Sequence, residues 1–154
     1  MSLLIQGLAT ETVDQLRRGG LDANQQPAVP TVARGGRNPC RHCLDLIAPG
    51  APMLIVGYRP FSTVQPYAEV GPVFLHAEPC ARYRGDHLPP WFAYLTPALI
   101  RGYDQDDRIV YPTGAVIDGP TIAARARAIL ADPEVAYVHV RSQWNCFQVQ
   151  IDRA

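Results

Sequence analysis

The sequence contains no lysine, so arginine supplies the whole count of fourteen strongly basic residues. This absence excludes two chemistries, because a Schiff base forms on a lysine amine and a Walker-type phosphate loop needs a lysine. Uniform use of arginine is more typical of a GC-rich coding bias than of a binding surface. Any chemistry of the chain therefore has to come from other side chains.

The sequence also lacks an excess of either charge. Fourteen acidic residues balance the arginines, which gives a formal net charge of +0, and the arginines are scattered along the chain. A nucleic-acid interface needs basic residues clustered on one face. We therefore expect no nucleic-acid partner, while a small-molecule ligand stays open.

No hydrophobic run approaches the roughly 18 residues that a membrane-spanning helix needs. The opening residues "MSLLIQGLATETVDQL" also lack the basic start and the small-residue cleavage site of a signal peptide. We therefore expect no membrane association and a cytoplasmic location. Cytoplasmic thiols are kept reduced, so a stable disulfide among the four cysteines is not expected.

Length and composition predict one globular domain over residues 1–154. A chain of 154 residues, 47% of them hydrophobic, suits a single core. Expected strands outnumber expected helices and do not alternate with them, which favours an α+β fold. We expect a mostly antiparallel sheet, two or three helices packed on it, and long ordered loops.

The expected strands are short apolar or alternating segments bounded by turn-forming residues. They cover residues 2–8, 52–60, 71–77, 98–112 (as a pair around the turn "DQDD"), 135–141 and 146–153. Helices are expected at 11–20, capped by Thr10, at 86–95 and, with the clearest periodicity, at 118–133. Residues 20–39 are rich in Pro, Gly, Asn and Gln, and we expect them to form a long loop that leads to Cys40.

Two pairs of potential metal ligands stand out from this framework. The segment "NPCRHCLDL" holds Cys40 and Cys43, whose spacing lets both sulfurs point at one ion, and "HAEPC" offers His76 and Cys80 after an expected strand. Four such ligands could close a tetrahedral zinc site. The interval between the pairs exceeds the usual 15–20 residues, and an intervening hairpin could absorb it. Free buried thiols and a redox pair are the alternatives.

A second set of candidates lies on the expected C-terminal hairpin. Alternation places Val138 and Val140 on one face, together with Phe147, Val149 and Ile151, and predicts that this face is core. The opposite face is predicted to carry Tyr137, His139, Arg141, Cys146, Gln148 and Gln150.

An enzyme could be built on that opposite face. His139 could serve as acid or base, Arg141 could hold an anion and Cys146 could act as a thiol nucleophile. Together with Cys40 and Arg41, these residues would act on a small anionic substrate. A solvated sheet face with one half-buried histidine is the simpler interpretation, so the sequence leaves open whether the protein is an enzyme.

Several segments in fixed order resemble a known family. They are "PCRHCL", "RPF", "PYAEVGPVFLH", "RGYD", "VAYVHVR" and "NCFQVQIDR", and they run from Cys40 to Arg153. Together they resemble the bacterial family catalogued as domain of unknown function 1203, whose name implies no activity, substrate or cofactor. The recurrent residues implied by the resemblance are Cys40, Arg41, Pro66, Tyr67, Gly71, Pro72, Tyr103, Asp104, His139 and Cys146.

The resemblance separates the two thiols of the Cys-x-x-Cys pair. Some family members carry a serine at the position of Cys43 and lack a counterpart of Cys80. The resemblance therefore implies that a zinc site would belong to a subgroup, with Cys40 and Arg41 as the general feature. Asn145 also departs from the family pattern, in which glycine precedes the late cysteine. We therefore expect a globular domain that holds zinc through Cys40, Cys43, His76 and Cys80. The alternative is an enzyme that acts on a small anionic substrate.

Overall fold

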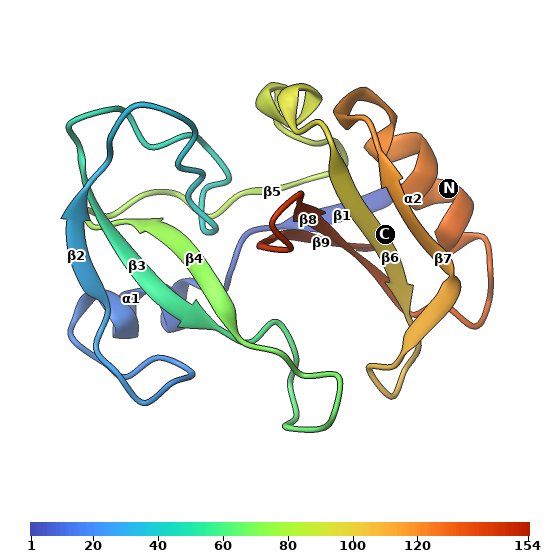
Figure 1. The fold of residues 1–154 in the computed structure, drawn as a ribbon, viewed down its shortest axis with the longest axis horizontal. Coiled ribbons are helices and arrows are strands. Elements are labelled where there is room, and N and C mark those ends of the chain that lie inside the picture. Colours follow the sequence, from blue (N-terminus) through green and yellow to red (C-terminus); the bar gives the residue numbers. More distant parts are fainter. The chain divides into compact units, whose positions relative to one another are not determined.

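The computed structural model describes residues 1–154 and divides the chain into two compact units. The first unit holds Met1–Gln6, Thr63–Ala68 and Arg84–Ala154, and the second holds Gly7–Ser62 and Glu69–Tyr83. Each unit has its own antiparallel sheet and one α-helix (Figure 1). The α+β class and the antiparallel pairing are confirmed, but two sheets replace the single expected one. The boundaries of one domain over residues 1–154 stay a prediction.

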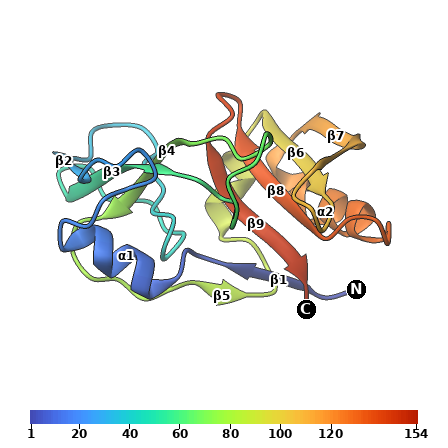
Figure 2. The same cartoon turned by 90° about the horizontal axis from the view of Figure 1, so that it is seen from below.

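The first unit is built on a six-stranded sheet. In sheet order its strands are β5 (Arg84–Gly85), β1 (Leu3–Gln6), β9 (Phe147–Arg153), β8 (Tyr137–Ser142), β6 (Ala98–Tyr103) and β7 (Ile109–Ile117). Helix α2 (Ile122–Leu130) contacts β6 and β8 (Figure 2). Its buried side chains are those of the predicted apolar stripe: Ile122, Ala126, Ile129 and Leu130.

Two short 3-10 helices complete the first unit. The segment expected as a helix at 86–95 forms η1 (Pro90–Tyr94), and η2 (Gly119–Thr121) directly precedes α2. Pro90 is the first residue of η1, a position at which proline is tolerated. Pro97 follows soon after its last residue, Tyr94, and the residue before a proline is disfavoured in a helix, so the segment cannot continue far as an α-helix. Strand β7 continues to Ile117 rather than ending near residue 112 as predicted.

The second unit has less regular structure. Its sheet has the order β2 (Val29–Val32), β3 (Pro52–Tyr58) and β4 (Gly71–His76), and its helix is α1 (Thr10–Arg17). Strand β2 lies inside the segment that the sequence predicts as loop, so the prediction is wrong there. This edge strand contains Pro30 and is largely exposed. Its pairing with β3, rather than its own composition, makes it a strand.

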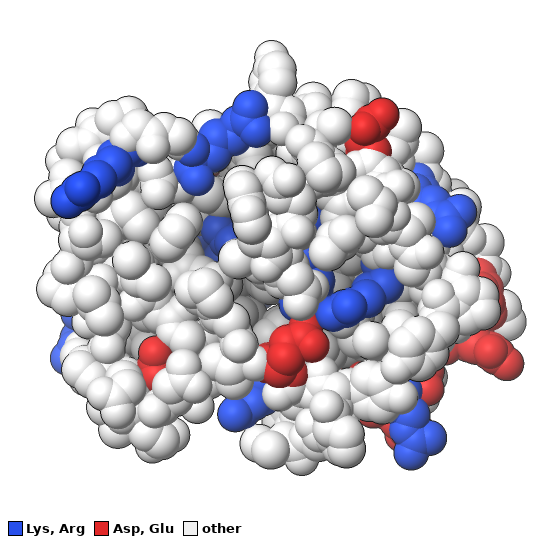
Figure 3. Space-filling model, viewed as in Figure 1, with Lys and Arg blue, Asp and Glu red and all other residues white.

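On the face drawn in Figure 3, arginine side chains are scattered over a mainly uncharged surface, and carboxylates lie among them. The absence of a nucleic-acid partner stays a prediction. Neither α1 nor α2, at 8 and 9 residues, is long enough to cross a membrane.

Candidate metal centre

The Cys-x-x-Cys segment is attached to the end of β4. Cys40 forms a single parallel bridge with Phe74, and the backbone N–H of Arg41 donates to the carbonyl oxygen of Phe74 at 2.9 Å. The segment then turns back, because the N–H of Leu44 donates to the carbonyl oxygen of Cys40 at 2.9 Å. The first ligand pair therefore lies beside β4, which ends at His76. The β3–β4 hairpin accounts for the long interval between the two ligand pairs.

Four potential ligand atoms gather at this point. One atom each from Cys40, Cys43, His76 and Cys80 lies within 4.8 Å of all the others. The Sγ atoms of Cys40 and Cys80 are 3.9 Å apart, and Cys43 Sγ is 3.4 Å from His76 Nδ1. A tetrahedron with Zn–S bonds of about 2.3 Å and Zn–N bonds of about 2.0 Å has edges of about 3.8 Å and about 3.5 Å. The two separations therefore match a tetrahedral site.

Hydrogen bonds give the two thiols of the Cys-x-x-Cys pair different pKa values. Cys40 is fully buried, whereas Cys43 and Cys80 are partly exposed. The hydrogen bond from the Cys43 thiol, helped by backbone N–H groups that include that of His76, lowers the pKa of Cys40 to about 4. The same thiol–thiol bond, together with burial, raises the pKa of Cys43. Without a metal, Cys40 is thus the more acidic thiol of the pair.

Three residues that sequence reasoning does not assign to the site complete its surroundings. Arg17 Nη2 donates to Cys80 Sγ at 3.2 Å, and His42 Nδ1 lies 3.1 Å from the same sulfur. Thr10, which was expected to cap α1, is its first residue, and its hydroxyl lies 3.0 Å from His42 Nε2 instead. The position of His42 between the two cysteines is a feature of the sequence that could have indicated its place beside the site. Arg17 has no such feature, because it is 63 residues from Cys80.

Gly7 lies where three stretches of chain meet. The N–H of Gly7 donates to the carbonyl oxygen of Tyr83 at 3.0 Å, and the N–H of Leu8 donates to that of Arg41 at 2.8 Å. Tyr83 in turn donates to the carbonyl oxygen of His42 at 2.9 Å. A Cβ atom at position 7 would lie 1.8 Å from that His42 oxygen. The backbone next to the ligand pair therefore leaves no room for a side chain at this position.

Arg41 is held by the same segment. Its side chain is buried, its Nη1 donates to the carbonyl oxygen of Pro39 at 2.7 Å, and its guanidinium carbon lies 5.9 Å from the ring centroid of Phe74. The contact with Phe74 joins the Cys-x-x-Cys segment to β4. These contacts support a structural role for Arg41.

The remaining candidates lie in the first unit, on β8 and β9. His139 and Arg141 are buried, so the prediction of a solvated face is wrong for these residues. A β-bulge places Arg141 opposite Phe147 and leaves Gln148 as an extra residue. The Phe147 ring consequently lies on the His139 side, with ring centroids 5.0 Å apart. It was predicted on the opposite face with Val149, because uniform alternation does not foresee a bulge.

The neighbours of His139 fix its proton. Arg141 Nη2 can only donate, and it lies 3.3 Å from His139 Nδ1, so Nδ1 accepts. The proton then sits on Nε2, which donates to Gln150 Oε1 at 3.3 Å. Burial, followed by the charges of Arg141 and Arg101, lowers the pKa of His139 well below its ordinary value. This neutral imidazole is bonded at both nitrogens, an arrangement that favours a structural role over general acid–base work.

Cys146 lies at the turn between β8 and β9. Its thiol donates to the carbonyl oxygen of Trp144 at 3.9 Å. A thiol nucleophile is usually activated by a base within hydrogen-bond reach, and this contact is to backbone instead. The five enzyme candidates are divided between the units: Cys40 and Arg41 in the second, and His139, Arg141 and Cys146 in the first. An enzyme that uses all five stays a prediction.

Acid is expected to destabilise the first unit through His139. Because folding lowers the pKa of His139, the unfolded chain binds its proton more readily than the folded chain. The stability is therefore complete above the unfolded pKa of about 6.5 and falls as the pH drops below that value, by at most about 1.4 kcal/mol per pH unit. Urea unfolding at about pH 7.5 and about pH 5.5 measures the loss.

The matched variant for this test is His139→Gln, which can accept from Arg141 and donate to Gln150. It should show a smaller loss of stability in acid than the wild type. Asp152, whose pKa is raised by burial, contributes with the opposite sign in both proteins and cancels in the comparison. Both tryptophans belong to the first unit, so their fluorescence reports on it. The same acid dependence in both proteins would contradict the prediction.

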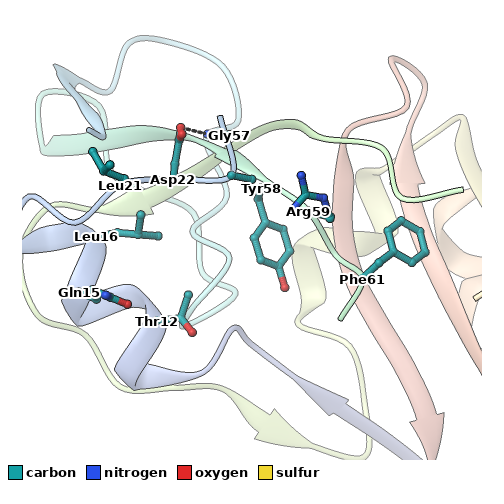
Figure 4. A pocket seen from close by; sticks show the side chains of 10 residues that line it. Thr12, Gln15, Leu16, Leu21, Asp22, Gly57, Tyr58, Arg59 and Phe61 are labelled. Atoms are coloured by element: carbon teal, nitrogen blue, oxygen red, sulfur yellow. Dashed lines mark hydrogen bonds between the residues drawn. The ribbon is translucent and has the colours of Figure 1, made fainter. Parts of the chain in front are cut away.

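The second unit also contains a cavity of about 180 Å³. Its walls come from α1, the following loop and the end of β3 (Figure 4), and include Thr12, Gln15, Leu16, Tyr58, Arg59 and Phe61. Asp22 braces the loop, because its Oδ2 accepts from the N–H of Gly57 at 2.7 Å. Helix α1 thus contributes Thr10 and Arg17 to the surroundings of the metal centre and three other residues to the cavity.

Fold and site together define an α+β protein with a cluster of three thiols and one imidazole that could hold a metal ion. The family model described as "Protein of unknown function (DUF1203)" matches residues 37–153, and the chain belongs to that family. The matched region contains all four potential ligands but begins after α1. No curated protein and no solved structure matches the chain.

Proposed function

We propose that the protein binds one zinc ion through Cys40, Cys43, His76 and Cys80, and that the ion stabilises the second unit. The observation that carries this proposal is the convergence of the four ligand atoms within 4.8 Å of one another, with two of the separations close to the edges of a tetrahedral site. Zinc suits such a donor set, because three thiolates and one imidazole are among its commonest structural ligands. The spacing within each pair lets both members reach the same ion.

The donor set favours a structural ion over a catalytic one. Catalytic zinc sites keep one position open for water or substrate, whereas structural sites take all four ligands from the protein. Here the protein can fill all four positions. Cys40 is also fully buried, which suits an ion that holds chain segments together.

The second unit is small enough that a bound metal ion would add substantially to its stability. It comprises about 70 residues, with three strands and one α-helix of 8 residues. A core this small seldom stabilises a fold alone, and natural domains of this size often add a metal or disulfides. The ion would join the Cys-x-x-Cys segment to the end of β4 and to the loop that follows it.

We place the protein in the cytoplasm, where thiols stay reduced. All four cysteines are free in the structure. Free thiols remain available as zinc ligands, so the compartment and the donor set agree. Disulfide formation between any two of the three ligand cysteines would remove both from the ion.

Metal analysis of the full chain, purified without added metal, tests the proposal. We expect about one zinc ion per chain and native-state alkylation of Cys146 alone, because the other three thiols would be metal-bound. Adding a strong chelator should then expose those three to alkylation. The proposal is contradicted by a metal-free protein in which all four thiols react in the native state.

A further inference from the structure

Cys80 has a second set of partners outside the four ligands. Arg17 Nη2 donates to its Sγ at 3.2 Å, and His42 Nδ1 lies 3.1 Å from the same atom. One charged donor and one imidazole nitrogen thus lie at hydrogen-bond distance from the same sulfur. This arrangement could stabilise a sulfur that carries negative charge, as a metal-bound thiolate does.

Arg17 spans both members of the second ligand pair. Besides its bond to Cys80, its Nε donates to the backbone carbonyl oxygen of His76 at 3.1 Å. Its Nη1 forms an ion pair with Asp14 at 3.3 Å, and only 9% of its side chain is exposed. The guanidinium is thus held in one orientation by three contacts. It is fixed from α1, an element that contributes no ligand.

Metal binding would fix the direction of the bonds at His42. A zinc-bound Cys80 has no proton to give, so the bond at His42 Nδ1 must run from the imidazole N–H to the sulfur. The Nε2 atom is then an acceptor, and the hydroxyl of Thr10 at 3.0 Å is its donor. A chain of two hydrogen bonds therefore leads from Thr10, the first residue of α1, to the metal ligand.

The charges at the site also favour a role for Arg17 in metal binding. Zinc with three thiolates and one neutral imidazole carries a net charge of −1, and Arg17 supplies one positive charge in direct contact with one of those thiolates. Groups that hydrogen-bond to metal ligands orient them and typically change metal affinity by about 10–100-fold when removed. Both ends of α1 would in this way be linked to Cys80, Arg17 directly and Thr10 through His42.

We propose that Arg17 and His42 are positioning residues of the metal centre, which donate hydrogen bonds to the zinc-bound sulfur of Cys80 and join α1 to the ion. This inference rests on the zinc site proposed above. It assigns a role to α1, which lies outside the region that the family model matches. The centre accordingly consists of four ligands and a helix that braces one of them.

Arg17→Gln tests the inference against Arg18→Gln, which removes the same charge from the adjacent, exposed position. Competition with a chromophoric chelator should show zinc affinity about 10–100-fold weaker for Arg17→Gln and unchanged for Arg18→Gln. Arg17→Lys, which keeps the charge and one donor, should restore part of the loss. Thr10→Val, which removes the donor to His42 with little change of shape, should weaken binding less than Arg17→Gln.

Cobalt(II) in place of zinc supplies a readout that a general loss of stability would not move. Hydrogen bonds to a thiolate lower the energy of its lone pair, so removing one should shift the sulfur-to-cobalt charge-transfer band to longer wavelength. We expect that shift in Arg17→Gln and not in Arg18→Gln. Wild-type affinity and an unshifted band in Arg17→Gln would overturn the inference alone. A wild-type chain that binds neither zinc nor cobalt would overturn the proposed zinc site as well.

Discussion

Replacing Cys40 by serine is expected to remove zinc from the protein and to loosen the second unit while the first stays folded. Cys40 is the buried ligand, and its sulfur also accepts the backbone N–H of His76 at 3.3 Å. A serine hydroxyl stays protonated at neutral pH, whereas zinc needs a deprotonated ligand. An equal share of the roughly 10–16 kcal/mol that structural zinc contributes corresponds to an affinity about 10²–10³-fold weaker.

Hydrogen exchange would locate the effect of Cys40→Ser. Faster exchange is expected in residues 10–17, 40–46 and 77–83, which surround the centre, and unchanged exchange in β8 and β9. Cys146→Ser is the matched control, because it removes a thiol from the first unit and should leave zinc content unchanged. A Cys40→Ser protein that keeps one zinc with wild-type affinity would show that the four residues are not the ligands.

Gly7→Ala is expected to have the second-largest effect. The added methyl group would lie 1.8 Å from the carbonyl oxygen of His42 and 2.6 Å from its carbonyl carbon. Both are backbone atoms, so the Cys-x-x-Cys segment would have to move away from residues 7 and 8. Such overpacking typically costs about 1–3 kcal/mol and occasionally more. Because the displaced segment carries two ligands, zinc affinity should fall together with the stability of the second unit.

The control for this variant is Gly71→Ala in β4. Position 71 has no atom within 4 Å of an added Cβ and needs no left-handed backbone. Alanine there should be tolerated or slightly stabilising, because it restricts the unfolded chain. Zinc content and hydrogen exchange in the second unit should therefore separate the two alanine variants. Equal behaviour of the two would refute the steric argument.

Hydrophobic periodicity and residue spacing predicted the helix, the hairpin and the ligand pairs that are formed by residues close together in the sequence. Helix α2 buries the apolar stripe that its sequence periodicity predicts, and β8 and β9 form the predicted hairpin. The ligand pairs were likewise predictable, because a Cys-x-x-Cys spacing by itself places two sulfurs near one point. What the spacing could not supply was the bridge between Cys40 and Phe74 that docks one pair beside the other.

The features that sequence reasoning missed depend on contacts between distant residues or on single-residue insertions. Strand β2 exists because β3 pairs with it, and Arg17 reaches Cys80 across 63 residues. The bulge at Gln148 moves Phe147 to the other face of the hairpin. Asn145, at the position where the resemblance implies a glycine, has a φ of 64°, and asparagine tolerates this left-handed conformation better than most residues. The hairpin turn is therefore kept without glycine.

The two roles of α1 have a thermodynamic consequence. One set of its residues, Thr10 and Arg17, is bonded to the surroundings of Cys80, and another, which includes Gln15 and Leu16, lines the cavity. A molecule that filled the cavity and displaced this helix would change the zinc dissociation constant. Linkage requires that zinc change the affinity for that molecule by the same factor. Zinc binding and binding in the cavity would then influence each other through the position of α1.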